Sequence, residues 1–267
     1  MNKHLVKLSQ AGWLRSTFRG LKLHKLYNWW LTKNPRIRVL PASGIIYRCR
    51  RTESVSLAIE ILEGGDCYDQ EMLPYHPGFT TFVDLGCNTG LFACWLQHYV
   101  PGRIKGLMVD ANPEVLVDAA WHVDVNNMDV SVLQGVVGSP KADEQAWVTF
   151  MVHEANTVST AQLASIQRPS DYTAITAPTR SIIHEWTKKM GQQRCHVLKM
   201  DVEGSELEFL KQETAFLQLV DTIFVEWHNY RVTFKELDAY LISQGFKLVK
   251  VLSSDAKSYN GTAFYSK

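Results

Sequence analysis

The sequence predicts an α/β fold with a mostly parallel sheet, helices on both of its faces and an antiparallel hairpin at the C-terminus. From residue 82 onward, short apolar runs typical of buried strands alternate with segments of helical periodicity. Repeated strand–helix units make consecutive strands parallel, because each helix returns the chain to the same edge of the sheet. The last two apolar runs, 246–251 and 262–265, have only a turn containing Asn260-Gly261 between them, which adds the antiparallel strand.

Length and composition indicate one folded domain with an N-terminal extension. The 267 residues are 46% hydrophobic and 21% charged, which is enough apolar material for a large core and argues against disorder. We divide the chain into a basic helical arm with an opening strand, residues 1–53, and a main domain, residues 54–267. No stretch approaches the roughly 18 apolar residues of a membrane span. Five scattered cysteines without C-x-x-C spacing, and no signal segment before them, predict a reduced, cytoplasmic protein.

The N-terminal arm is strongly basic. Residues 1–52 contain twelve Lys or Arg and no Asp or Glu, although the whole chain has a net charge of only +1. Apolar residues recur near helical spacing between the basic ones: Leu14, Phe18, Leu21, Leu26 and Trp30. We favour a helix packed on the domain; the alternative is contact with a membrane surface or a polyanion, which would make the protein peripheral at a membrane. A short strand over 45–49 closes the arm.

The first half of the main domain alternates strands with helices. In chain order we predict a strand over 82–85, a helix over 91–100, a strand over 104–110, a helix from 113 to about 125 and a strand over 130–137. Asn112 is a good N-cap and Pro113 suits the first helical position, so a helix begins there. Residues 138–180 show weak periodicity and are expected to be irregular or hairpin-like.

The second half continues the alternation up to the hairpin. We predict a helix over 182–190, a strand over 196–201, a helix over 207–217, a strand over 222–226 and a helix over 234–244. Gly245 follows the last of these helices and is typical of a helix end.

The segment from Phe82 to Gly90, Phe-Val-Asp-Leu-Gly-Cys-Asn-Thr-Gly, is the clearest sign of a ligand site. Its glycines allow a tight turn and close approach of a ligand to the backbone, while the helix that follows offers unpaired N–H groups. Asn88 stands where a dinucleotide fingerprint needs glycine, which disfavours a pyrophosphate. Asp84 beside the loop suits a cationic ligand, and S-adenosylmethionine has both an ammonium and a sulfonium group.

Later strand ends supply the rest of a nucleoside site. Asp110 lies 24 residues beyond Gly86, the distance at which a carboxylate receives both ribose hydroxyls. Val136 and Val137 would flank an adenine ring. Each acid alone could be an ordinary turn residue, but together at successive strand ends they favour a nucleoside. The predicted cofactor-binding residues are Asp84, Gly86, Cys87, Asn88, Gly90, Asp110, Ala111, Val136 and Val137.

Carboxylates and a histidine after the fourth and fifth strands predict the reaction zone. His228 is the best candidate general base, because its unperturbed pKa is about 6.5, whereas a carboxylate near 4 is a weak base unless burial raises it. Asp201 and Glu203 would position a hydroxyl, and Glu206 and Glu226 would contact the substrate. No covalent intermediate is needed, because a sulfonium already activates its methyl group.

Other interpretations of these residues stay open. Asp201 and Glu203 could cap the following helix, and His228 could be a structural histidine. Lys199, inside an apolar strand, could pair with a nearby acid or extend toward water. A divalent cation held by Asp201, Glu226 and His228 is a further option that we do not favour, because the three need not converge.

The motifs together resemble those of FkbM-type S-adenosylmethionine-dependent methyltransferases, over roughly residues 45–251. The matching segments are DLGCNTG at 84–90, DANP at 110–113, LKMDVEGSE at 198–206 and VEWH at 225–228. Asp110 is a departure, because the family usually has Glu there, and residues 138–195 cannot be matched.

The resemblance implies a class I methyltransferase (Rossmann-like) fold with a seven-stranded sheet, and most often O-methylation of a hydroxyl on a sugar or small natural product. The alternatives are a module that binds the cofactor without turnover, or a peptide, lipid or RNA acceptor. Nucleic acid is not expected, because no RNA-binding module is recognisable. A dinucleotide oxidoreductase is disfavoured by the missing fingerprint, and the oligomeric state is not predicted.

Overall fold

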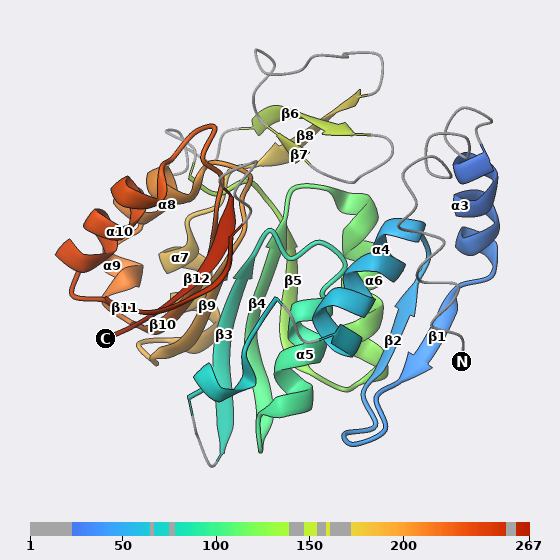
Figure 1. Cartoon of the computed structure of the whole chain (residues 1–267), viewed down its shortest axis with the longest axis horizontal. Helices are drawn as coiled ribbons and strands as arrows, with labels where there is room; N and C mark the ends of the chain where they lie inside the picture. The colour runs from blue at the N-terminus through green and yellow to red at the C-terminus, as the bar shows by residue number, and fades with distance from the viewer. Residues whose placement is uncertain are drawn as a thin grey trace.

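The computed structural model describes most of the chain (Figure 1). The described ranges are 23–64, 67–74, 78–138, 147–153, 159–160, 172–254 and 260–267. The first part of the predicted basic helix, around Leu14 to Leu21, lies outside them. Within these ranges, no helix combines the length and the hydropathy that crossing a membrane requires.

A seven-stranded sheet in the order β11-β12-β10-β9-β3-β4-β5 forms the centre of the molecule. The strands from β10 to β5 are parallel to one another, and β12 is antiparallel to both β10 and β11. This arrangement confirms the class I methyltransferase architecture. The strands are β3 Phe79–Leu85, β4 Arg103–Asp110, β5 Asp129–Gln134, β9 Cys195–Met200, β10 Val220–Trp227, β11 Lys247–Ser254 and β12 Gly261–Ser266.

Helices cover both faces of this sheet, so two hydrophobic cores form (Figure 1). Side chains alternate along a strand, and in β3 Val83 and Leu85 enter one core while Phe82 enters the other. The first core is closed by α7 Ile182–Met190, α8 Glu206–Gln212, α9 Thr214–Leu217 and α10 Phe234–Ser243. The second is closed by α4 Thr52–Ala58, α5 Leu91–Tyr99, α6 Pro113–Val125 and β2 Ile46–Cys49.

Several smaller elements lie outside the central sheet and the helices that cover it. They are α3 Leu23–Lys33, β1 Arg36–Val39 paired with β2, the π-helix η1 Ile59–Gly64, the 3₁₀ turn η2 Gln70–Met72, and an antiparallel sheet of β6 Trp147–His153, β7 Ser159–Thr160 and β8 Tyr172–Pro178. The hairpin-like character predicted for 138–180 is confirmed in its described part. The strand β1, the helix α4 and the π-helix were not predicted.

Two predicted boundaries are wrong for identifiable reasons. The third strand ends at Gln134 rather than 137, because Val136 leaves the sheet and pairs with Thr179 instead. The helix predicted over 207–217 is interrupted at Glu213. That carboxylate accepts hydrogen bonds from the backbone N–H groups of Ile182 and Ile183, 2.6 and 3.0 Å away, and so satisfies the first turn of α7.

The order in which the chain adds strands to the sheet switches sides between β3 and β9, although these two strands are parallel. From β3 the sequence proceeds through β4 to β5, and it then crosses back to β9 and β10 on the other side. Loops after the carboxyl ends of β3 and β9 therefore diverge and leave a crevice, where doubly wound sheets bind their ligands.

Candidate active site

The glycine loop after β3 has the backbone that its sequence predicts. Gly86 and Gly90 have φ of +68° and +79°, and Asn88, a residue that tolerates this region, has +49°. A Cβ at position 86 would lie 1.7 Å from the carbonyl oxygen of Asp201, so only glycine fits there. The loop thus touches the end of β9 directly and joins the two halves of the crevice.

Asp110, at the end of β4, holds the loop from the other side. Its Oδ2 accepts from the N–H of Asn88 and its Oδ1 from the N–H of Asn112, each at 2.8 Å. Burial raises the pKa of Asp110 to about 6, although both hydrogen bonds oppose this. Each carboxylate oxygen has a second lone pair, so Asp110 can still accept hydrogen bonds from a ligand.

Asp84 and Lys199 form a buried pair beneath the loop. Lys199 Nζ lies 3.2 Å from Asp84 and donates to the carbonyl oxygen of Gly86 at 2.7 Å. Burial opposes the charge of Lys199, but Asp84 and Asp201 outweigh it and keep its pKa well above the usual value. Burial raises the pKa of Asp84, and Lys199 counteracts this shift. Because Nζ has several oxygen partners at once, we treat the two residues as an ion pair that supports the loop.

A cavity of about 340 Å³ opens at the carboxyl ends of these strands. Of the residues predicted from sequence, ten line it: Gly86, Cys87, Asn88, Asp110, Ala111, Val136, Val137, Asp201, Glu203 and Glu226. Asp84, Gly90, Glu206 and His228 are not among its lining residues. Asp84 and Gly90 therefore support the conformation of the loop without facing the cavity.

The lining fits S-adenosylmethionine chemically. Gly86 and Asn88 bring backbone close to the cavity, Asp110 offers carboxylate oxygens suited to ribose hydroxyls, and Val136 with Val137 offers an apolar surface suited to a base. Asp84 is neutralised by Lys199 behind the loop, but the cavity wall itself is mainly acidic. Among the described residues that line it, the acidic ones are Glu53, Glu60, Asp110, Asp201, Glu203 and Glu226, and the one basic residue is Lys199. A ligand with cationic groups matches that charge.

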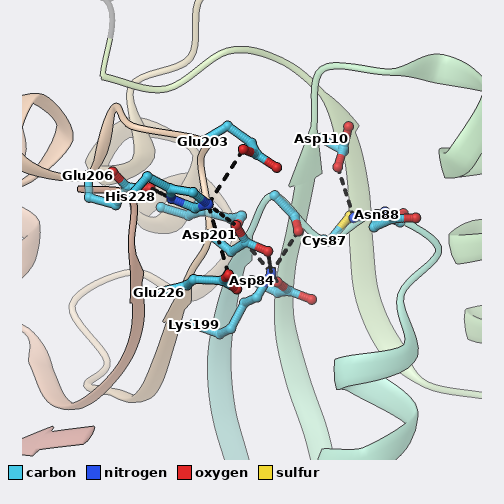
Figure 2. Close-up of polar contacts among 12 residues, drawn as sticks. Asp84, Cys87, Asn88, Asp110, Lys199, Asp201, Glu203, Glu206, Glu226 and His228 are labelled. Carbon is cyan, nitrogen blue, oxygen red and sulfur yellow. Dashed lines mark hydrogen bonds and ion pairs between the residues drawn. The ribbon is translucent and has the colours of Figure 1, made fainter. Parts of the chain in front are cut away.

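His228 lies at the centre of an acidic cluster formed by Asp201, Glu203, Glu206 and Glu226 (Figure 2). Its Nδ1 is 2.9 Å from Oε1 of Glu206, which is fully buried and also accepts from the N–H of Gly204. Glu206, predicted as a substrate contact, is thus placed behind the histidine. The other ring nitrogen, Nε2, lies 3.5 Å from Glu203, 3.8 Å from Asp201 and 3.9 Å from Glu226.

Crowding of carboxylates changes the acid–base properties of this cluster. Burial opposes the charge of His228, but the hydrogen bond with Glu206 and the charges of Asp201 and Glu203 raise its pKa to about 10. Burial and Asp201 raise the pKa of Glu203 to about 7. Asp201 and burial raise the pKa of Glu226 to about 8. At neutral pH His228 is an imidazolium, and Glu203 is the group closest to equal populations of its two forms.

The geometry of the same cluster would allow it to hold a metal ion. Ligand atoms of Asp201, Glu203 and His228 lie within 4.8 Å of one another, and Glu226 is adjacent. The sequence suggested Asp201, Glu226 and His228 as a disfavoured option for this role, and the fold does bring them together.

Several residues of the site were not among the predicted ones. Glu53, Glu60 and Tyr68 line the cavity from α4 and the segment after it, far from the strand-end motifs. His122 is fully buried in α6, with Nε2 accepting from the N–H of Arg48 and Nδ1 facing the carbonyl oxygen of Thr89, each at 2.8 Å. It therefore connects β2 to the glycine loop. The only sign of this role in the sequence was the position of His122 on the apolar face of the helix predicted from residue 113.

A model of the Methyltransferase FkbM domain matches residues 102–248. No curated protein matches the sequence.

Solved structures resemble the chain at low identity. The methyltransferase FkbM from Methylobacillus flagellatus KT is 15% identical with a TM-score of 0.47; the match covers 76% of this chain and 49% of that one. The Methanococcus jannaschii fibrillarin pre-rRNA processing protein is 11% identical with a TM-score of 0.49, covering 88% and 83%. M. capricolum TrmK in complex with S-adenosyl-homocysteine is 11% identical with a TM-score of 0.44, covering 74% and 65%. The chain therefore spans about half of the FkbM structure and just under two thirds of TrmK.

Proposed function

Because the chain belongs to the FkbM methyltransferase family, and is therefore an S-adenosylmethionine-dependent methyltransferase, we propose that it methylates a hydroxyl oxygen of a small acceptor such as a sugar. The observation that carries this proposal is the acidic cluster around His228 at the cavity beside the glycine loop (Figure 2). When bound, the cofactor supplies a methyl group already activated on its sulfonium. What the protein must add is a positioned oxygen and a proton acceptor.

The site divides into a cofactor half and a reaction half. Asp110, Asn88 and Val136 hold the nucleoside and the methionine end from the β3 and β4 side, as their place in the lining supports. Asp201, Glu203 and Glu226 line the opposite side, from the ends of β9 and β10. An acceptor hydroxyl between the two halves would lie within reach of carboxylate oxygens that orient it.

The electrostatics suggest how the cluster takes up the proton. Glu206 holds Nδ1 of His228, so that Nε2 points at the other carboxylates. In many enzymes a carboxylate fixes the orientation of a catalytic histidine in the same way. With its pKa near 10, however, His228 already carries a proton at pH 7. Glu203, with a pKa of about 7, is better matched to accept one, and imidazolium at 3.5 Å keeps it in place. We assign the base to the Glu203–His228 pair, with Glu203 as the acceptor.

A labelled-methyl assay with sugar, lipid, peptide and RNA pools tests the proposed acceptor class. Label in a sugar or another small hydroxylated product is expected, in a linkage that survives the mild alkali that cleaves esters. Label that enters only RNA or peptide would overturn the small-acceptor assignment. Absence of transfer to any pool, combined with cofactor binding, would instead favour a module without turnover.

The pH dependence of turnover tests the base. If Glu203 accepts the proton, kcat rises with pH through a midpoint near 7, and Glu203→Gln lowers kcat much more than it weakens cofactor binding. Glu226→Gln is the comparison variant, because that carboxylate also lines the reaction half and lies at a similar distance from Nε2; a smaller loss of kcat is expected there. A midpoint near 10 would return the role of base to His228, and an equal loss in both variants would assign the proton to the whole cluster.

A further inference from the structure

Helix α3 turns its apolar stripe outward. Leu26, Trp29 and Trp30 are 62%, 60% and 47% exposed, and with Lys33 they occupy positions i, i+3, i+4 and i+7 of the helix. Residues at this spacing lie on one face, which in a surface helix normally packs on the core. Here that face, with two tryptophans, meets solvent.

Contacts on the opposite face fix this orientation. Leu31 is fully buried, and Oδ1 of Asn28 accepts from both the N–H and the hydroxyl of Thr52, at 3.0 and 2.9 Å. These contacts attach α3 to the first turn of α4. The exposure of the stripe therefore follows from how the helix is bound to the domain.

The strand after the helix continues the exposed surface. Every residue of β1 is exposed, with Ile37 and Val39 each at 55%, and Arg36 donates to the hydroxyl of Tyr27 on α3 at 2.7 Å. Figure 1 shows α3 and β1 at the same edge of the molecule, outside α4 and α6. We call Leu26, Trp29, Trp30, Lys33 and β1 the arm surface.

The segment of chain that carries the arm surface has charges of one sign. Residues 23–52 contain seven Lys or Arg and no Asp or Glu. Arg48 and Arg50 are engaged by Asp118, whereas Lys33, Arg36 and Arg38 belong to the arm surface and are exposed. Exposed tryptophan and aliphatic side chains among basic ones are typical of a surface that enters the headgroup region of an anionic bilayer.

We propose that the arm surface docks on an anionic membrane, with Trp29, Trp30 and Leu26 inserted at the level of the headgroups. Two copies of this surface would repel each other, because neither carries an acidic residue to meet the other's basic ones. Its aliphatic members, Leu26, Ile37 and Val39, match the acyl boundary better than they match the phosphates and bases of RNA. Docking here would hold the catalytic cavity close to the bilayer, because α4 supplies Glu53 and Leu57 to its wall.

The test is co-sedimentation of the full chain with vesicles of phosphatidylcholine, with and without 25% phosphatidylglycerol. We expect binding to the anionic vesicles that weakens with added salt, and at least a tenfold loss for the double variant Trp29→Ser/Trp30→Ser. The matched control is Ile242→Ser/Val249→Ser, two exposed apolar residues outside the arm surface, which should bind like the wild type. Thermal melting of each variant confirms that it is folded.

Other outcomes would overturn the proposal. Failure of the wild type to bind anionic vesicles would do so, as would full binding by the tryptophan variant, which would place the membrane contact elsewhere in the chain. Sedimentation velocity is run in parallel: a dimer that the tryptophan variant dissociates, without vesicle binding, would assign the surface to a second copy. Tighter binding to an RNA oligonucleotide with the same dependence on Trp29 and Trp30 would assign it to nucleic acid.

Discussion

Replacing Glu206 by glutamine should lower the pKa of His228 while leaving the histidine in place. The amide side chain keeps the shape and one acceptor oxygen, so contacts with Nδ1 of His228 and the N–H of Gly204 can persist. What is lost is the negative charge 2.9 Å from the ring. A hydrogen bond to a charged group contributes about 1.5–3 kcal/mol against about 0.5–1.5 kcal/mol for a neutral one, a difference of roughly 1 kcal/mol or more.

That difference sets the expected shift. One pKa unit corresponds to about 1.36 kcal/mol, so the pKa of His228 should fall from about 10 by roughly one unit. NMR titration of the labelled imidazole, assigned with a His228→Asn variant, measures it directly. The shift should also appear in stability. A histidine whose pKa is raised by folding stabilises the protein below its unfolded pKa of about 6.5, and this stabilisation is lost as pH rises toward 10.

In Glu206→Gln, the loss of unfolding free energy between pH 7 and 10 should therefore be smaller than in the wild type. A His228 pKa that is unchanged by the substitution would refute the view that Glu206 sets the charge of this cluster. A pKa near 6.5 in the wild type would refute the account of the cluster altogether, and would restore His228 as an ordinary base.

Three further predictions concern the scaffold of the site. Gly86→Ala should abolish cofactor binding and lower the melting temperature, because a Cβ would lie 1.7 Å from the carbonyl oxygen of Asp201. The control is Gly191→Ala, a glycine also at positive φ but with open space around it, and equal effects of the two substitutions would contradict a special role of position 86. Burial lowers the pKa of His122, so as the pH drops below about 6.5 the unfolded state binds the proton first and the protein loses stability. Urea unfolding should therefore show a smaller loss of unfolding free energy from pH 7 to 5 in His122→Gln than in His184→Gln, which replaces an exposed histidine; equal losses would contradict this role of His122. Asp118→Asn should weaken the attachment of β2 to α6 and lower the unfolding free energy by about 1.5–3 kcal/mol, because Arg48 and Arg50 lose a shared charged acceptor. A change below about 0.5 kcal/mol would show that these ion pairs contribute little.

The sequence predicted the parts of the fold that depend on local patterns. Strands buried on both faces appear as continuous apolar runs, and the N-cap at Asn112 is a local hydrogen bond with Glu114, so their positions could be inferred without tertiary contacts. The glycine loop was equally accessible, because Gly86 and Gly90 are required by backbone conformation.

Features that depend on distant partners could not be predicted. The break at Glu213 arises from its contact with α7, some 30 residues earlier, and no local signal encodes it. The charge of His228 depends on carboxylates from the ends of both β9 and β10, so its pKa in the folded protein could not be inferred from the value of an isolated histidine. Tyr68 and Glu53 reach the cavity only because the segment before β3 folds over it.

Calorimetric binding of S-adenosylhomocysteine tests the central claim, that the cavity beside the glycine loop holds the methyl donor. We predict one site per chain in the wild type and at least tenfold weaker binding in Asp110→Ala, because hydrogen bonds to a charged acceptor contribute about 1.5–3 kcal/mol each. Asp124→Ala, which removes an exposed acid near the C-terminal end of α6, should bind like the wild type. Absence of binding by the folded wild type, or tight binding by Asp110→Ala, would contradict the account.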